Sequence, residues 1–229
     1  MDARTTNTVQ AADRVSAFLW KVYGWMAVGL GLTAVVAFVV AGSPEIIRAL
    51  VGNRLVFFGL VIAELGLVFF LSARAHRLAP STAAGLFTLY SALNGVTLSV
   101  ILLAYTGESV TTTFVVTAGM FGALALFGST TKRSLAGAGQ FFMMGLVGLI
   151  LASIVGVFWH SDALQFLISV VGVIVFTGLT AWDAQRLKQM ALALPEGQVG
   201  AYAIVGALSL YLDFINLFLM LLRFTGRRE

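Results

Sequence analysis

Residues 55–73 read LVFFGLVIAELGLVFFLSA and lie between Arg54 and Arg74. Glu64 is the single charged residue in this run, and apolar side chains do not alternate with polar ones. A helix of about 20 apolar residues crosses the hydrocarbon core of a bilayer, which is roughly 30 Å thick. A strand of a membrane barrel would instead alternate apolar with polar residues. The run therefore predicts a membrane-spanning helix.

Six further apolar runs of similar length follow the same pattern, at residues 22–41, 80–105, 110–128, 139–159, 163–182 and 201–222. The prediction is an all-α integral membrane protein with seven transmembrane helices. Residues 1–229 are predicted to form a single domain, with short tails at 1–20 and 223–229, because the loops are too short for a soluble domain. Small residues inside the runs predict close helix packing.

The composition supports the same class. Hydrophobic residues make up 59% of the chain and charged residues 10%, against about 45–50% and about 25% in soluble proteins. These values exclude a soluble enzyme and a disordered chain. The absence of cysteine excludes thiol catalysis and cysteine metal sites. The Lys and Arg residues form no dense patch, so we expect the lipid bilayer, and no nucleic acid, as a partner.

The distribution of Lys and Arg predicts the orientation. A cytoplasmic N-terminus places nine of them on the cytoplasmic side: Arg4, Arg14, Lys21, Arg74, Arg77, Lys132, Arg133, Arg186 and Lys188. Cytoplasmic loops carry such an excess. Arg223, Arg227 and Arg228 break the pattern if the last run crosses the membrane, and keep it if that run enters and returns. We favour a full span.

Three acidic residues lie in the predicted spans or directly at the end of one: Glu64, Asp213 and, after the sixth run, Asp183. A charge inside a bilayer is costly, so each is a candidate functional residue. The alternative for each is a carboxyl group that only holds helices together. We expect Glu64 to face the protein interior. Asp183 ends the sixth run, so it can face Asp213 only if the seventh helix is broken or begins with turns outside the membrane, around residues 196–205.

Asn94 forms a polar stripe with Ser91 and Thr97 in the third run. Residues three apart share one face of a helix. The stripe either lines a pore or makes interhelical hydrogen bonds.

Three stretches together indicate a family: LSLYLDFINLFLMLLRF at residues 208–224, AWDAQRLK at 181–188 and LYSALNGVTLS at 89–99. The chain resembles the Bax inhibitor family of seven-helix membrane proteins, and most closely its prokaryotic calcium-leak branch. The resemblance extends over nearly the whole chain and includes GSTTKRSL at 128–135. Its most specific part is the last helix, with Asp213, Asn216 and Arg223.

The resemblance implies a last helix that is central and surrounded by the other six. It implies that Asp183 and Asp213 are a pH sensor and gate, and that an arginine, Arg74 or Arg77, contacts them as a latch. The implied activity is a pH-dependent passive calcium flux and not an enzymatic reaction. The implied location is the cytoplasmic (inner) membrane of a bacterium.

The chemistry of a carboxyl pair agrees with this activity. Two carboxylates within hydrogen-bonding reach cannot both ionise cheaply, so they titrate as a unit. Calcium prefers six to eight oxygen ligands, so Asp183 and Asp213 would form a weak calcium site that needs further oxygens. Asn94 and Asn216 are candidate donors, and Glu64 is a candidate path residue. No cofactor is expected besides the transported calcium.

Two other functions remain as alternatives. One is a non-conducting regulator that binds another membrane protein, such as a membrane-anchored AAA protease or a cell-death factor. The other is an intramembrane aspartyl protease, which the motifs disfavour. In those enzymes the second aspartate follows Gly-x-Gly, whereas Asp213 follows Leu210, Tyr211 and Leu212, and Pro-Ala-Leu does not occur.

Overall fold

The computed structural model describes residues 3–75, 77–159, 161–195 and 198–227, with side chains from residue 10 onward. Within these residues the secondary structure is helical, as predicted: α1 (Ala3–Ala41), α2 (Pro44–Gly52), α3 (Arg54–Arg74), α4 (Pro80–Leu102), α5 (Gly107–Thr130), α6 (Ala136–Phe158), α7 (Asp162–Ala193) and α8 (Val199–Thr225). All but α2 are long and apolar enough to cross a membrane. The prediction of seven spanning helices is confirmed.

By internal contacts the chain divides into two compact units. Unit 1 comprises residues 1–104 and 189–211, and unit 2 comprises residues 105–188 and 212–229. Helices α7 and α8 are each shared between the units. The prediction of one domain over residues 1–229 stays a prediction.

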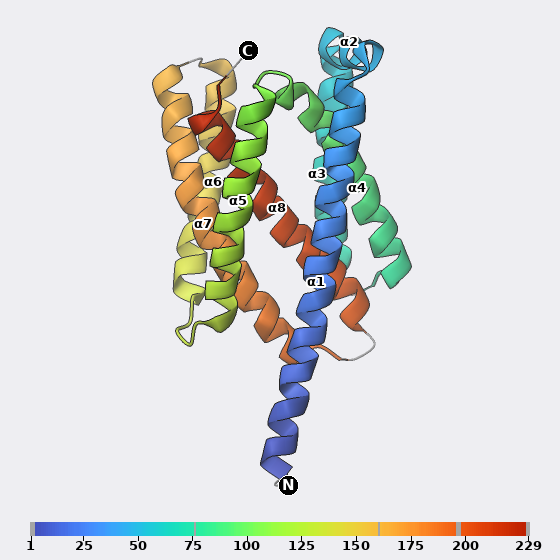
Figure 1. Ribbon diagram of the computed structural model, residues 1–229, viewed down its shortest axis with the longest axis vertical. Helices are drawn as coiled ribbons and strands as arrows, with labels where there is room; N and C mark the ends of the chain where they lie inside the picture. The colour runs from blue at the N-terminus through green and yellow to red at the C-terminus, as the bar shows by residue number, and fades with distance from the viewer. Residues whose placement is uncertain (1–2, 76, 160, 196–197, 228–229) are drawn as a thin grey trace. The chain divides into compact units, whose positions relative to one another are not determined.

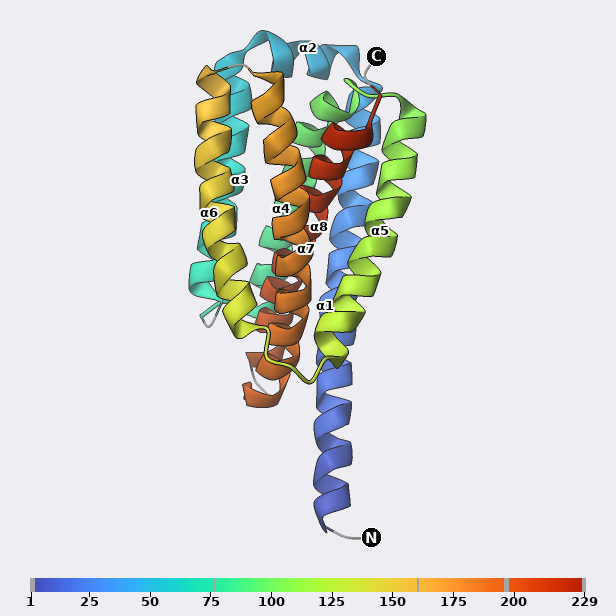
Figure 2. The same ribbon diagram turned by 90° about the vertical axis from the view of Figure 1, so that its left-hand side faces the viewer.

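Unit 1 contains an element that the sequence analysis missed. Helix α2 lies across the ends of α1 and α3, and it also contacts α4 (Figure 2). Pro44 begins α2, a position where its missing N–H is not needed. Leu50 is buried, whereas Val51 is exposed. A nine-residue amphipathic helix is too short to be recognised as a span.

The first helix is longer than predicted. Residues 3–20, expected as part of a tail, are helical and continuous with the first span, and α1 extends beyond α3 and α4 in Figure 1. The composition explains this extension, because no glycine or proline occurs between residues 3 and 23.

The predicted end of the sixth span is wrong. Helix α7 continues past Trp182 to Ala193, so Asp183 lies inside a helix of 32 residues. The polar residues that follow Asp183 are helical, and Gln185 among them contacts the loop between α5 and α6. Of the two conditions for Asp183 to face Asp213, a broken last helix does not apply, because α8 is unbroken from Val199 to Thr225; early turns outside the membrane stay a prediction.

Helix α8 is an uninterrupted helix of 27 residues. At 1.5 Å per residue it is about 40 Å long, which is sufficient for a full crossing. It does not turn back over its described length. Of the seven candidate spans it is the most buried, with 72% of its most apolar window buried against 11–39% in the others. This burial agrees with the central place that the resemblance implies.

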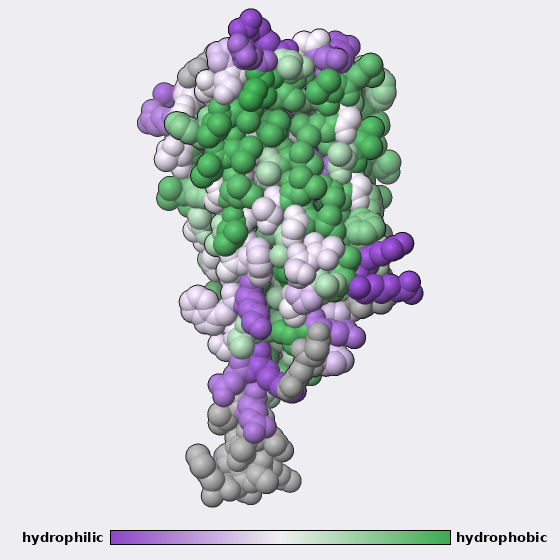
Figure 3. Space-filling view, turned by 90° about the vertical axis from the view of Figure 1, so that its right-hand side faces the viewer, coloured by the Kyte–Doolittle hydropathy of each residue, from purple (hydrophilic) through white to green (hydrophobic). Residues whose placement is uncertain are grey.

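Large apolar side chains lie on the outside of the chain. Phe38, Phe69 and Phe158 are 82%, 72% and 84% exposed. The face drawn in Figure 3 carries a broad hydrophobic band, with hydrophilic residues at both of its ends. A water-facing surface rarely tolerates contiguous apolar areas of this kind. The protein is therefore an integral membrane protein.

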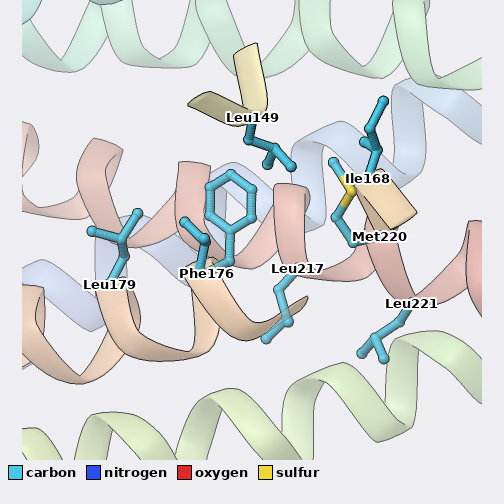
Figure 4. Close-up of a cluster of buried hydrophobic side chains, with 8 residues drawn as sticks. Leu149, Ile168, Phe176, Leu179, Leu217, Met220 and Leu221 are labelled. Carbon is cyan, nitrogen blue, oxygen red and sulfur yellow. The ribbon is translucent and has the colours of Figure 1, made fainter. Parts of the chain in front are cut away.

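Unit 2 is built around contacts between α6, α7 and α8. A cluster of buried side chains from these three helices fills its interior (Figure 4): Leu149, Ile168, Val175, Phe176, Leu179, Leu217, Met220 and Leu221. Glycines let the helices approach closely. A Cβ atom at Gly139 would overlap the Trp182 ring, and one at Gly178 would overlap the Phe142 ring. The small residues thus serve the close packing that the sequence predicted.

Candidate functional site

Unit 2 brings together two of the acidic residues singled out in the sequence. Asp183 of α7 and Asp213 of α8 are 9% and 6% exposed. Their carboxyl groups are near enough for the charge of Asp183 to act on Asp213. Each has one buried oxygen, Oδ1 of Asp183 and Oδ2 of Asp213, with no hydrogen-bond partner among the described residues. The two side chains form the carboxyl pair.

One cation lies next to the carboxyl pair in unit 2. The Arg186 guanidinium is 3.9 Å from Oδ1 of Asp183, which is too long for a hydrogen bond. Arg186 stacks over the Trp182 ring, with 5.5 Å between its Cζ and the ring centroid. Because this side chain is 53% exposed, its ion pair is weak. It does not neutralise the pair in the way a buried arginine would.

The α7 segment that follows Asp183 is bonded to the end of α5 and to the loop between α5 and α6. Gln185 is buried; its Nε2 donates to the carbonyl oxygen of Arg133 (2.8 Å), and its Oε1 accepts from the backbone N–H of Leu135 (2.7 Å). Lys188 Nζ donates to the carbonyl oxygen of Ser129 (2.7 Å). These bonds explain why polar residues continue a helix that was predicted to end at Trp182.

We expect Gln185→Leu to lower the free energy of unfolding by about 2 kcal/mol, because two backbone groups lose their hydrogen bonds to a buried side chain. The thermal unfolding midpoint of detergent-solubilised protein should fall by a few degrees. Gln189→Leu is the matched control, since Gln189 lies one turn further along and is exposed. Equal midpoints for the two variants would contradict the role assigned to Gln185.

Glu64 and Asn94 lie in unit 1. Glu64 is buried, as expected, and its Oε1 accepts a hydrogen bond of 2.5 Å from the Thr97 hydroxyl. Asn94 Nδ2 donates to the Tyr90 hydroxyl (3.0 Å), while its Oδ1 has no partner among the described residues. Thr97 thus makes the interhelical bond that the packing hypothesis for the polar stripe predicted. A role of Glu64 and Asn94 in an ion path stays a prediction.

Two further hydroxyls extend this polar group in unit 1. Thr33 Oγ1 lies 2.6 Å from the Tyr211 hydroxyl and donates to the carbonyl oxygen of Ser91 (2.8 Å). Because the hydrogen of Thr33 is used on Ser91, the Tyr211 hydroxyl must donate to Thr33. Tyr211 also packs edge-on against the Tyr90 ring. The buried polar group therefore links α1, α3, α4 and the first half of α8.

Three predicted site residues remain, Asn216, Arg74 and Arg77, and the contacts described for them are with residues outside the carboxyl pair. Asn216 Nδ2 donates to the carbonyl oxygen of Leu212 in its own helix (2.8 Å). Arg74 ends α3 and stacks over Phe70, and the backbone N–H of Arg77 donates to the carbonyl oxygen of Arg74 (2.9 Å). Both arginines belong to unit 1, and the carboxyl pair belongs to unit 2. The latch stays a prediction for either arginine.

The sequence analysis missed Gln185, Tyr90, Tyr211 and Thr33. Tyr90 had a usable signal, because residues 90, 94 and 97 follow the helical spacing of one face. Tyr211, Thr33 and Gln185 had none, since their partners lie 178, 58 and about 50 residues away.

Metal-binding capacity is limited in the part of the chain that the structure describes. There, no three His, Cys, Asp or Glu side chains cluster so that they could hold a metal ion. The carboxyl pair supplies two acidic groups, short of the six to eight oxygens of a strong calcium site.

The fold and this site define a seven-helix integral membrane protein with a buried carboxyl pair on consecutive helices. The family model described as "Inhibitor of apoptosis-promoting Bax1" matches residues 15–229. The chain belongs to this family, the Bax inhibitor family.

Relatives match over nearly their whole length. "Inner membrane protein YbhL" of Escherichia coli strain K12 is 49% identical over 229 residues, covering 99% of this chain and 98% of the relative. An uncharacterized protein of Borreliella burgdorferi is 44% identical over 214 residues, covering 93% and 92%. One of Deinococcus radiodurans is 43% identical over 218 residues, covering 95% and 93%.

Proposed function

We propose that the protein mediates a pH-sensitive passive calcium leak, with Asp183 and Asp213 as sensor and gate. The observation that carries the proposal is the carboxyl pair: two buried, interacting carboxyl groups on consecutive helices, each with an oxygen free of hydrogen bonds among the described residues. A pair of this kind has no evident use in packing alone, because an unsatisfied buried carboxyl oxygen costs stability.

The protonation of the pair supplies the switch. With one shared proton the pair carries a single negative charge and a strong hydrogen bond that ties α7 to α8. Removing that proton places two negative charges face to face, and adding a second removes the charge that attracts an arginine. Both changes loosen the contact between the helices.

The ligand chemistry suits a leak. Two carboxyl groups bind calcium weakly unless amides, hydroxyls or water complete the shell. Conduction requires an ion to leave a site as readily as it binds. Glu64 and Asn94, with oxygens in the buried polar group of unit 1, are the proposed path residues. Asn216 is a further proposed donor. No cofactor and no catalytic step are part of this proposal.

We propose a cytoplasmic N-terminus and a location in a bacterial inner membrane. Gln185 bonds to the loop that carries Lys132 and Arg133, and Lys188 bonds to Ser129 in the last turn of α5. With Arg186, which follows Gln185 in α7, four basic residues therefore lie at one end of unit 2: Lys132, Arg133, Arg186 and Lys188. Such an excess is typical of the cytoplasmic end of a membrane protein. The Escherichia coli relative is named an inner membrane protein.

Calcium flux measured in liposomes that contain the purified protein tests the proposal. A fluorescent calcium dye inside the liposomes reports calcium entry. We expect this entry to need no energy source and its rate to change with pH. Liposomes without protein provide the background. Flux equal to that background at every pH would contradict a leak. That result would favour the regulator that binds a membrane-anchored AAA protease or a cell-death factor.

The separation of α7 and α8 near the carboxyl pair should be smallest at an intermediate pH. The reason is that the singly protonated pair holds them together, whereas both other protonation states do not. Distances between spin labels placed on the two helices within two turns of the pair provide the measurement. If the distance does not change with pH, or if it changes in Asp183→Asn as much as in the wild-type protein, the pair is not the sensor.

A further inference from the structure

Unit 2 contains a cavity of about 370 Å³ between the first turns of α7 and the last turn of α8. Its volume is typical of small-molecule sites, which occupy about 300–1,000 Å³. The lining comes from α7 and α8 and consists of Asp162, Gln165, Phe166, Ser169, Arg223 and Phe224. Neither member of the carboxyl pair lines it.

One face of α7 forms most of the cavity wall. Its four α7 residues follow the i, i+3, i+4, i+7 pattern of one helix face. Ser169 is fully buried, and its hydroxyl donates to the carbonyl oxygen of Gln165 (2.9 Å). The Phe166 and Phe224 rings lie 5.5 Å apart. The cavity thus has an aromatic side and a polar side.

Opposite charges occur in this one cavity. Asp162 begins α7 and Arg223 lies in the last turn of α8. The ends of spanning helices lie at the depth of the lipid headgroups. A guanidinium matches the geometry of a phosphate, and a carboxylate accepts hydrogen bonds from an ammonium group. The presence of both charges in one cavity at headgroup depth suits a zwitterion.

We propose that this cavity binds the headgroup of a phospholipid with a primary amine. Its phosphate lies on Arg223 and its ammonium group on Asp162. Phe166 and Phe224 contact the glycerol and the first methylene groups. The proposal does not depend on calcium conduction.

The amine distinguishes this ligand from other lipids. A trimethylated amine has no N–H to donate to Asp162, so it loses the hydrogen bond although it keeps the charge. An anionic lipid without an amine places negative charge near Asp162 and gains nothing there. The cavity should therefore prefer phosphatidylethanolamine to phosphatidylcholine and phosphatidylglycerol.

Native mass spectrometry of the wild-type protein with an N-methylation series tests the preference without any variant. Phosphatidylethanolamine and its mono-, di- and trimethylated forms differ only in the number of N–H donors. We expect affinity to fall along the series, by about tenfold from first to last, as for loss of a charged hydrogen bond. Equal affinities across the series would overturn the proposal.

Variants locate the binding. In Asp162→Asn the ratio of affinities for the first and last members should fall towards one, and in Arg223→Gln all members should bind more weakly. Glu108→Gln and Arg227→Gln are the matched controls, because neither residue lines the cavity. A preference that survives in Asp162→Asn would place the lipid elsewhere and overturn the assignment.

A final arm separates a lipid from a soluble ligand of the same chemistry. Free phosphoethanolamine presents the same phosphate and amine without acyl chains. We expect it to displace the lipid only weakly, since the aromatic side of the cavity contributes to binding. Displacement at equal concentration would overturn the assignment to a membrane lipid.

Discussion

Calcium flux through Asp213→Asn protein is expected to lose most of its dependence on pH between about 5 and 9. The switch proposed for the carboxyl pair requires two groups that share one proton. Asparagine keeps the size of the side chain but removes its charge and its titration. An interaction of about 1.4 kcal/mol within the pair changes the gating equilibrium tenfold. Without the pair this change is lost, so the ratio of the highest to the lowest flux across the pH range should fall towards one.

Glu108→Gln is the control for this experiment, since it removes a carboxylate from the first turn of α5 and leaves the carboxyl pair intact. Its pH curve should overlay that of the wild-type protein. If the curve of Asp213→Asn also overlays it, Asp213 only stabilises the fold, and the gate assignment is wrong.

Gly128→Ala is expected to lower the free energy of unfolding by about 3 kcal/mol, near the upper end for overpacked sites. A Cβ atom at Gly128 of α5 would overlap the carbonyl oxygen of Ala181 in α7. A backbone atom cannot rotate away as a side chain can, so the two helices must separate. Thermal unfolding in detergent measures the effect.

Gly122→Ala is the matched control in the same helix, because a Cβ atom there would meet nothing within 4 Å. Alanine favours helix over glycine by about 1 kcal/mol, so this variant should be neutral or more stable. A loss of stability equal to that of Gly128→Ala would show that the close contact of α5 with α7 is not the cause. Since Ala181 lies two residues before Asp183, flux in Gly128→Ala also reports whether the position of α7 matters for the gate.

The spans were predictable because each apolar run is a local property. Residues 55–73 must satisfy their own backbone groups inside a bilayer, so they form a helix whatever surrounds them. The short helix α2 was missed for the opposite reason. Nine amphipathic residues carry no membrane signal, and its place across the ends of α1 and α3 depends on tertiary contacts.

The candidate site divides in the same way. The sequence alone determined that this chain is an all-α membrane protein, and that Glu64, Asp183 and Asp213 are exceptional, because a carboxyl group in an apolar run is costly wherever the run lies. Only the tertiary structure decided that α7 continues past Trp182, since Gln185 is satisfied by the backbone of residues 133 and 135. It also decided which oxygens of the carboxyl pair have no hydrogen-bond partner among the described residues. The hydrogen bonds of Gln185 join residues about 50 positions apart, and no local sequence pattern encodes them.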